Sequence, residues 1–256
     1  MFDSGIGGLS ILKTLLCQRR DLDIYYWADD AHTPYGSKSD DYVKARCHSI
    51  CQSFIEMDIQ LIVVACNTAT AIAINDLRAH FQGVTFVGIE PYVNVVNHIP
   101  WQAEHRAVIL TTPLTGRSER FTHLKAHLDP EHKLEHFSCP ELAKIVESAF
   151  WQGSENIKAQ VHQELRPIQD RHYEYAILGC THYPLVGRYI QEILNAEVIS
   201  PCAAVARRVL SLLQLEPLPS PRTSDAPNLS FHLKRSSLPT DYERVDFSCD
   251  ESWPAL

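Results

Sequence analysis

The sequence predicts an α/β fold made of two similar α/β lobes, each with a mostly parallel sheet flanked by helices. Apolar, strand-like runs alternate with amphipathic helical stretches along most of the chain, which is typical of parallel sheets covered on both faces. Two runs, LIVVAC at 61–66 and YAILGC at 175–180, are continuously apolar, as expected of strands buried on both faces. Each ends in a cysteine followed by polar residues, and the two lie in different halves of the chain.

Strands and helices alternate from the first residues. Met1 and Phe2 are expected to end a strand before a Gly-rich turn, and Leu9, Leu12 and Leu16 have helical spacing. Further strands are expected at 23–30, 61–66, 84–91, 107–112, 133–139, 175–180 and 197–202. Further helices are expected at 40–56, 68–81, 92–98, 115–127, 141–150, 154–170, 185–194 and 205–213.

The sequence changes character after about Glu216. The stretch EPLPSPRTSDAPN is rich in Pro and Ser, which predicts a linker or a loose tail rather than a core element. LSFHL at 229–233 can still add an edge strand.

The composition indicates a globular protein that can bury a core. The chain has 256 residues, enough for one large domain or two small ones, and 45% of them are hydrophobic. The formal net charge of -8 provides no basic stripe for a phosphate backbone, so no nucleic-acid partner is expected, whereas a small charged metabolite is compatible with it.

The compartment expected from the sequence is the cytoplasm. The longest apolar runs are much shorter than the ~18 residues of a membrane span, and the N-terminus lacks the pattern of a secretory signal. No membrane contact is therefore expected. The cysteines, at 17, 47, 51, 66, 139, 180, 202 and 249, are too dilute for a disulfide scaffold, so we expect reduced thiols.

Cys66 and Cys180 are the strongest candidates for chemistry. Ligands of open α/β sheets bind beyond the carboxyl ends of strands, and both cysteines fall there, at the expected start of a helix. Helix N-termini lower the pKa of a thiol and offer N–H donors to a carboxylate. The alternative is a buried cysteine acting as a small hydrophobe. Because polar pairs follow both cysteines, Asn67 and Thr68 in one case and Thr181 and His182 in the other, we favour a functional role.

Other motifs are weaker when taken alone. Cys47, His48 and Cys51 have no second ligand pair at zinc spacing, so no metal site is expected. DSGIGG at 3–8 completes neither the dinucleotide fingerprint nor the P-loop. Asp3 and Ser4 would lie at a strand end, where they can receive an ammonium group, orient a thiol or simply cap the first helix.

Three further candidates have ordinary structural interpretations. PYG at 34–36 can close a pocket but is by itself only a turn. Glu147 alone would be a solvated residue on its helix, and His182 alone would be a satisfied core histidine.

Taken together, DSGIGG, PYG, ACNTATA, GIEP and GCTHYPL, in this order, resemble the glutamate racemase family of bacterial cell-wall synthesis, within the aspartate/glutamate racemase superfamily. The resemblance covers about residues 1–215, and the two cysteine motifs are its specific part.

The resemblance implies a role for particular side chains. Cys66 and Cys180 would be the catalytic thiols, assisted by Asp3, His182 and Glu147. The substrate contacts implied by the family are Asp3, Ser4, Tyr35, Gly36, Asn67, Thr68, Thr181 and His182.

The resemblance also implies a reaction and an architecture. One thiolate would take the α-proton of glutamate while the opposite thiol donates one, so no cofactor is needed. D-Glutamate for peptidoglycan would be the product, and a homodimer is expected. The first lobe would hold residues 1–91 plus 203–256, the second 92–202, with the active site in the cleft between them.

Some positions depart from the family pattern. Only Met1 and Phe2 precede Asp3, so we expect a very short first strand. Thr111 and Ser200 stand where the family commonly has Gly and Asp.

Three alternatives stay open from the sequence. The protein can be a racemase of aspartate or another acidic amino acid, or a catalytically impaired protein that only binds acidic amino acids. A Cys/His hydrolase would require Cys180 alone and leave Cys66 without a role.

Overall fold

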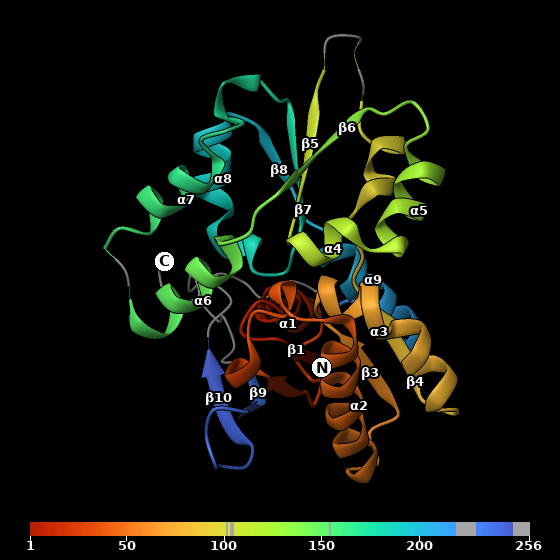
Figure 1. Cartoon of the computed structure of the whole chain (residues 1–256). Coiled ribbons are helices and arrows are strands. Elements are labelled where there is room, and N and C mark those ends of the chain that lie inside the picture. Colours follow the sequence, from red (N-terminus) through yellow and green to blue (C-terminus); the bar gives the residue numbers. More distant parts are fainter. Residues whose placement is uncertain (101, 103–104, 154, 219–228, 248–256) are drawn as a thin grey trace.

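The computed structural model describes residues 1–256 except 101, 103–104, 154, 219–228 and 248–256. It contains two sheets, placed one above the other in Figure 1. We call the six-stranded sheet and the helices packed on it the first lobe, and the four-stranded sheet with its helices the second lobe. The predicted α/β fold with two lobes is confirmed.

The sheet of the first lobe has the strand order β10-β9-β2-β1-β3-β4. All neighbours are parallel except β9 and β10, which form an antiparallel pair. Its strands are β1 Phe2–Asp3, β2 Tyr25–Ala28, β3 Leu61–Val64, β4 Thr85–Gly88, β9 Leu229–Arg235 and β10 Glu243–Phe247. Its helices are α1 Leu9–Gln18, α2 Asp40–Glu56, α3 Asn67–His80 and α9 Cys202–Leu213.

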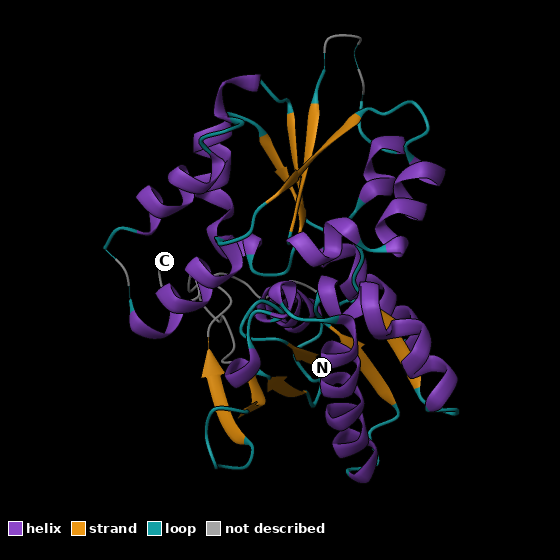
Figure 2. Cartoon of the chain, in the orientation of Figure 1, coloured by secondary structure: helices purple, strands orange, loops and turns teal. Residues whose placement is uncertain are grey.

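The sheet of the second lobe has the order β6-β5-β7-β8, and all its pairs are parallel. The strands are β5 Ala107–Thr111, β6 Leu134–Ser138, β7 Tyr175–Gly179 and β8 Glu197–Ile199. The helices are α4 Pro113–Arg117, α5 Glu119–Leu128, α6 Leu142–Gln152, α7 Ile157–Leu165 and α8 Gly187–Leu194. Figure 2 shows helices on both sides of this sheet, with α7 and α8 on one side and α4 and α5 on the other.

Several predicted boundaries were wrong. The segment near 92–98 forms a 3₁₀ turn, Val93–Asn97, instead of an α-helix. The helix expected at 115–127 is two helices, because Ser118 adopts an extended conformation and its side chain caps α5. The residues expected to begin one helix at 185 belong to a 3₁₀ turn, Tyr183–Val186, that precedes α8.

The C-terminal segment also differs from its prediction. Leu229–Arg235 and Glu243–Phe247 are strands of the sheet and not a loose tail, and β9 lies between β2 and β10 instead of at the edge. The sequence analysis missed β10 because only its last four residues, RVDF, alternate polar and apolar side chains, which is too short a pattern to stand out. Most of the predicted Pro- and Ser-rich linker lies outside the described residues.

β1 occupies the middle of its sheet although it is only two residues long. Phe2 pairs with Trp27 of β2 and with Val64 of β3. The Phe2 side chain is fully buried, and its ring lies 6.5 Å from that of Phe54 on α2. Packing of this one side chain therefore fixes the position of Asp3, the next residue.

The two lobes share a continuous hydrophobic core. One buried cluster combines Ile6, Leu12 and Val63 of the first lobe with Leu110 and Leu178 of the second. The lobes are therefore in contact through apolar side chains as well as through the polar groups described below.

The cysteine prediction holds for most of the described thiols. Cys47, Cys51, Cys66, Cys139, Cys180 and Cys202 are free and buried. Cys17 is disulfide-bonded, so the expectation of reduced thiols is wrong for this residue. A composition can exclude a disulfide scaffold, but one bond requires only that two thiols meet with suitable geometry. Cys249 lies outside the described residues.

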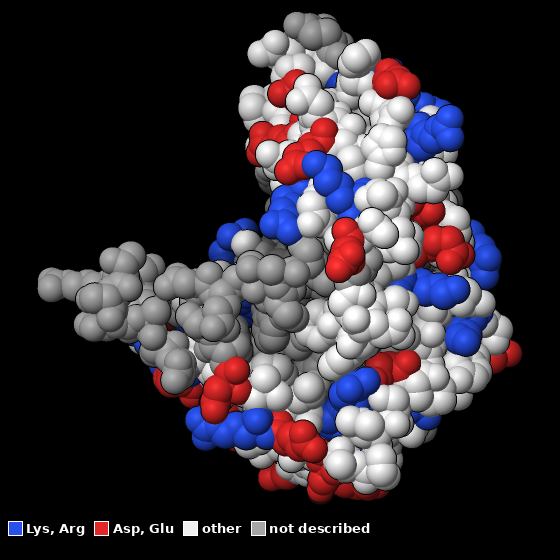
Figure 3. Space-filling view, turned by 90° about the vertical axis from the view of Figure 1, so that its left-hand side faces the viewer, with Lys and Arg blue, Asp and Glu red and all other residues white. Residues whose placement is uncertain are grey.

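The surface carries mixed charge. On the face shown in Figure 3, Lys and Arg side chains are interspersed with Asp and Glu over the described residues. None of the helices in the described part of the chain is both long and apolar enough to cross a membrane.

We expect Phe2→Ala to lower the free energy of unfolding by about 3–5 kcal/mol, because a buried aromatic ring is lost from the centre of the sheet. Urea denaturation followed by circular dichroism measures this. Leu238→Ala is the control, since Leu238 is 43% exposed and its loss should change stability by about 0.5 kcal/mol or less. Equal stability losses in the two variants would contradict the anchoring role of Phe2.

Candidate active site

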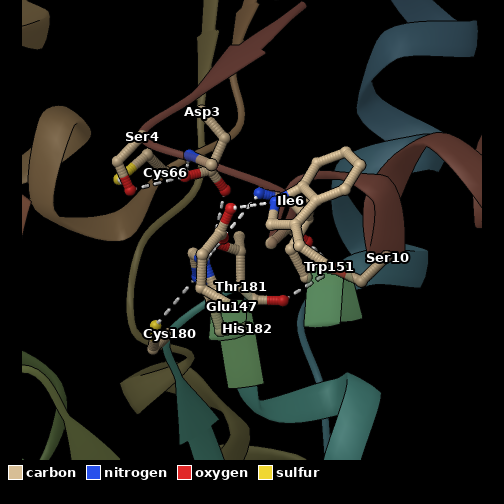
Figure 4. Close-up of polar contacts among 12 residues, drawn as sticks. Asp3, Ser4, Ile6, Ser10, Cys66, Glu147, Trp151, Cys180, Thr181 and His182 are labelled. Atoms are coloured by element: carbon tan, nitrogen blue, oxygen red, sulfur yellow. Dashed lines mark hydrogen bonds and ion pairs between the residues drawn. The ribbon is translucent and has the colours of Figure 1, made fainter. Parts of the chain in front are cut away.

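The carboxyl ends of β1, β3 and β7 meet where the two lobes touch. Asp3 ends β1, Cys66 follows β3 and Cys180 follows β7. Figure 4 shows the side chains of these residues with Ser4, Glu147, Thr181 and His182 in one group. The structure thus brings together both cysteines and their expected partners from distant parts of the sequence.

Cys66 begins a chain of hydrogen bonds within the first lobe. Its Sγ donates to Ser4 Oγ at 3.9 Å, and Ser4 Oγ donates to Asp3 Oδ1 at 2.9 Å. Cys66 is also the N-cap of α3, where its Sγ accepts from the backbone N–H of Ala69 at 3.5 Å. The prediction that this thiol lies at a helix N-terminus is confirmed.

Cys180 has a corresponding chain in the second lobe. His182 Nδ1 lies 3.9 Å from Cys180 Sγ, and His182 Nε2 lies 2.8 Å from Glu147 Oε2. Since a carboxylate only accepts, Nε2–H is the donor in the second contact. Cys180 precedes a 3₁₀ turn that begins at Tyr183, so the expected α-helix start is wrong here.

Two further hydrogen bonds connect the hydrogen-bond series of Cys66 with that of Cys180, from one lobe to the other. Thr181 Oγ1 of the second lobe donates to Asp3 Oδ2 at 2.7 Å. The Ile6 N–H of the first lobe donates to Glu147 Oε2 at 2.9 Å. Glu147 is buried, so its interpretation as a solvated residue is wrong.

Burial and neighbouring charges set the protonation of these groups. Burial, together with the charge of Asp3, raises the pKa of the Cys66 thiol well above its ordinary value. Burial likewise raises the pKa of Asp3, although the charge of His182 opposes that shift. Burial alone would lower the pKa of His182, but hydrogen bonds to Cys180 and Glu147 raise it well above its usual range. These hydrogen bonds therefore favour the imidazolium form of His182 next to Cys180.

The Gly-rich loop after β1 permits this close approach. A Cβ on Gly5 would lie 2.2 Å from Glu147 Oε2, and a Cβ on Gly7 would lie 2.3 Å from His182 Nδ1. Tyr26 fixes the loop, because its hydroxyl donates to the carbonyl of Gly5 at 2.8 Å. A side chain at Gly5 or Gly7 would therefore clash with Glu147 or His182.

Tyr35 and Gly36 lie on a 3₁₀ turn beside the site. The Tyr35 hydroxyl donates to Asp29 Oδ2 at 2.5 Å, and Arg46 binds both oxygens of Asp29 at 2.9 and 2.8 Å. Burial raises the pKa of Tyr35, so the ring stays a neutral phenol. Gly36 packs closely on the second lobe, since a Cβ there would lie 2.8 Å from Thr112 Cβ.

Asn67 and Thr68 follow Cys66 at the start of α3. Asn67 Nδ2 donates to the Ile89 carbonyl at 3.4 Å, whereas its Oδ1 is buried without a hydrogen-bond partner in the described residues. The unpaired oxygen is an acceptor available to a ligand donor. Thr68 forms a ring of three hydroxyls with Thr112 and Thr115 of the second lobe, with each pair 3.0 Å apart.

The site is closed in this structure. The side chains predicted for it are buried, and the exposed fraction of Cys66 and Cys180 is only 5% and 6%. A ligand can reach these thiols only if the side chains that cover them move. As for metals, the described residues contain no group of three or more His, Cys, Asp or Glu side chains able to hold an ion.

The sequence analysis missed several residues that support the site. Asp29 and Arg46 fix Tyr35, and Thr112 and Thr115 bind Thr68, but no local pattern marked them. Trp151 Nε1 donates to Glu147 Oε1 at 2.8 Å. Trp151 lies four residues after Glu147 and one residue beyond the predicted end of that helix, and this spacing is a signal that would have found it.

Comparison with known proteins places the chain in a family. The model of the Asp/Glu/Hydantoin racemase family matches residues 18–209. The glutamate racemase of Pseudomonas aeruginosa is 34% identical over 247 residues, which cover 96% of this chain and 91% of that protein. The glutamate racemase of Herpetosiphon aurantiacus is 35% identical over 226 residues, covering 88% and 87% of the two chains.

Solved structures agree with this result. Escherichia coli glutamate racemase, in complex with L-glutamate and the activator UDP-MurNAc-Ala, has 29% sequence identity and a TM-score of 0.76, covering 88% of this chain and 85% of that one. The enzyme of Francisella tularensis in complex with D-glutamate has 25% identity and a TM-score of 0.74, covering 93% and 87%. This chain belongs to the Asp/Glu/hydantoin racemase family.

Proposed function

We propose that the protein is a cofactor-independent glutamate racemase that interconverts L- and D-glutamate with Cys66 and Cys180 as its two bases. The observation that carries the proposal is that each lobe supplies one buried thiol, linked to its own carboxylate, at a single closed site. The names of its curated relatives and the glutamate bound in solved relatives support glutamate as the substrate.

The reaction is a proton transfer at each face of the α-carbon. One cysteine thiolate takes the α-proton, so that the C–H bond breaks, an S–H bond forms and the electron pair stays on a planar carbanion. The thiol on the opposite face then donates its proton to that carbon and becomes a thiolate. Each turnover leaves the proton on the other cysteine, so the enzyme is ready for the reverse direction.

The two thiols differ in their surroundings. Burial and the charge of Asp3 favour the protonated form of Cys66, which suits an acid. The imidazolium of His182 lies 3.9 Å from Cys180 Sγ and would stabilise a thiolate there, which suits a base. In the resting enzyme, Cys180 would therefore act first on the enantiomer whose α-proton faces it.

The remaining predicted residues would bind the substrate. Asn67 Oδ1, buried without a partner in the described part of the chain, can accept from the substrate ammonium group. When the substrate enters, the hydroxyls of Thr68 and Thr181 would exchange their partners in the closed structure for the α-carboxylate, and such donors would stabilise the carbanion in a site without water. Tyr35 and Gly36 would close the pocket. Ser4 would link Cys66 to Asp3, because its hydroxyl accepts a hydrogen bond from the thiol and donates one to the carboxylate.

Several broader features belong to the same proposal. Separation of the lobes would admit the substrate, with residues 1–91 plus 203–256 in one lobe and 92–202 in the other. The product D-glutamate would serve peptidoglycan synthesis. We infer a cytoplasmic homodimer that requires neither metal nor cofactor and binds neither membrane nor nucleic acid.

The central test is exchange of the α-proton in heavy water, followed by proton NMR with L-glutamate, D-glutamate and aspartate. We expect deuterium to enter glutamate as its enantiomer forms, and Cys66→Ala and Cys180→Ala each to lose racemisation, because both faces require a thiol. Aspartate tests the related acidic substrate. Loss of activity in Cys180→Ala alone would favour the Cys/His hydrolase, and a folded wild-type protein without exchange would refute the racemase proposal.

We expect His182→Gln to lower kcat/KM by roughly 10²- to 10⁴-fold and to move the pH optimum to higher pH. The variant removes the imidazolium that lies 3.9 Å from Cys180 Sγ, and a neighbouring cation favours the thiolate form of a cysteine. The profile of kcat/KM over roughly pH 6 to pH 10 measures the shift. A uniform loss of activity with an unmoved optimum would show that His182 does not stabilise the thiolate.

We expect Gly5→Ala to reduce kcat by about 100-fold, because the new Cβ would displace Glu147 Oε2, which is 2.2 Å away. The free energy of unfolding should fall by about 1–3 kcal/mol. Gly187→Ala is the matched control, since its Cβ would meet nothing closer than Val198 Cγ1 at 3.7 Å. Full activity in Gly5→Ala would mean that the position of Glu147 is not critical.

A further inference from the structure

The carboxylate of Glu147 accepts hydrogen bonds from two groups besides His182. Oε2 accepts from the Ile6 N–H at 2.9 Å and from His182 Nε2 at 2.8 Å. Oε1 accepts from Trp151 Nε1 at 2.8 Å. The indole therefore fixes the rotation of the carboxylate and leaves Oε2 directed at His182, as Figure 4 shows.

The indole of Trp151 is itself covered by a residue of the first lobe. The guanidinium carbon of Arg235, the last residue of β9, lies 3.6 Å from the centre of the Trp151 ring. A cation over the face of an indole is attracted to it. Because Trp151 is on α6, this contact joins the C-terminal strands of the first lobe to the second lobe.

Arg235 is in turn fixed in place. Its Nε and a terminal nitrogen lie 2.8 and 2.7 Å from Asp30 Oδ2, and the Asp30 side chain is only 5% exposed. Burial alone would raise the pKa of Asp30, but hydrogen bonds from Ser237 and Arg235 lower it, so it stays ionised. Asp30 follows β2, which pairs with β9.

These contacts form one path from the C-terminal strands to a reacting thiol. It runs from Arg235 to Trp151, from Trp151 to Glu147, and from Glu147 through His182 to Cys180. Only the contact between Arg235 and Trp151 crosses from one lobe to the other, so the path is complete only when the lobes are closed.

We propose that Trp151 is a positioning residue, which holds Glu147 against His182, and that Arg235 locks Trp151 in that position when the lobes close. The inference rests on the proposed racemase function and adds the β9–β10 pair to the parts of the protein that this function needs. The C-terminal strands thereby act on Cys180 without touching the substrate.

The direct test is Trp151→Phe, which keeps a ring under Arg235 but removes the N–H donor. We expect kcat to fall by roughly 10- to 100-fold with little change in KM, since one hydrogen bond to a buried charge is lost. The high-pH limb of kcat/KM should move to lower pH, because the hydrogen bond to Glu147 helps to raise the pKa of His182 and a less firmly held Glu147 raises it less.

Other groups facing Glu147 should not reverse this shift. Asp3 of β1 and Tyr26 of β2 interact electrostatically with Glu147, and His182 lies before the 3₁₀ turn. All three are unchanged in Trp151→Phe. An indole with a purely structural role would lower activity at every pH and leave the limb where it is.

A second variant tests the lock. Arg235→Ala should lower kcat by about three- to tenfold, because the ring keeps its donor but loses the cation over its face. Lys234→Ala is the matched control: Lys234 is the preceding residue of β9 and lies over Trp27 and Tyr242, 4.6 and 5.5 Å from the ring centres, away from Glu147. It should retain wild-type activity.

A readout that needs no turnover separates this inference from the proposed function. The imidazole NMR signals of His182, assigned by their absence in His182→Gln, should shift in Trp151→Phe and stay unchanged in Lys234→Ala. A wild-type protein without proton exchange would refute the racemase proposal alone. Unmoved His182 signals, or a Trp151→Phe variant within twofold of wild type and with the same pH profile, would overturn the positioning role.

Discussion

Two carboxylates buried between the lobes are the constraint on which the rest of the structure depends. An uncompensated buried charge costs several kcal/mol, so Asp3 and Glu147 require donors. Each carboxylate receives one from the opposite lobe: Thr181 donates to Asp3, and the backbone of Ile6 donates to Glu147. The two carboxylates are therefore fully hydrogen-bonded only when the lobes are closed. Separation of the lobes would remove one donor from Asp3 and one from Glu147 at the same time.

Most of the fold could be predicted because its elements carry strong local patterns. The run at 61–66 is apolar throughout, and α2 extends from Asp40 to Glu56, the same bounds as its helical pattern. The errors have physical causes. The Ser118 side chain caps a new helix in the middle of a helical pattern. β10 is stabilised by pairing with β9, and such a distant partner is not visible in a window of the sequence.

The two thiols of the candidate site could be predicted from their strand ends, but the partners that tune them could not. The resemblance to a known family, and not periodicity, singled out Glu147, because a glutamate on an amphipathic helix normally faces solvent. The role of Arg235 depends on its contact with Trp151, a residue of the other lobe that is distant in the sequence. No local pattern encodes such a contact, whereas the i,i+4 spacing of Trp151 was readable.

The ring of hydroxyls formed by Thr68, Thr112 and Thr115 has a consequence for how the closed state responds to its surroundings. Each hydroxyl both donates and accepts, so three groups 3.0 Å apart satisfy one another without any charge. Salt does not screen these hydrogen bonds between neutral hydroxyls, and no proton is gained or lost when they break. Water can replace each bond as the ring separates, so this part of the lobe contact can open and re-form at little cost, whatever the salt or pH of the medium.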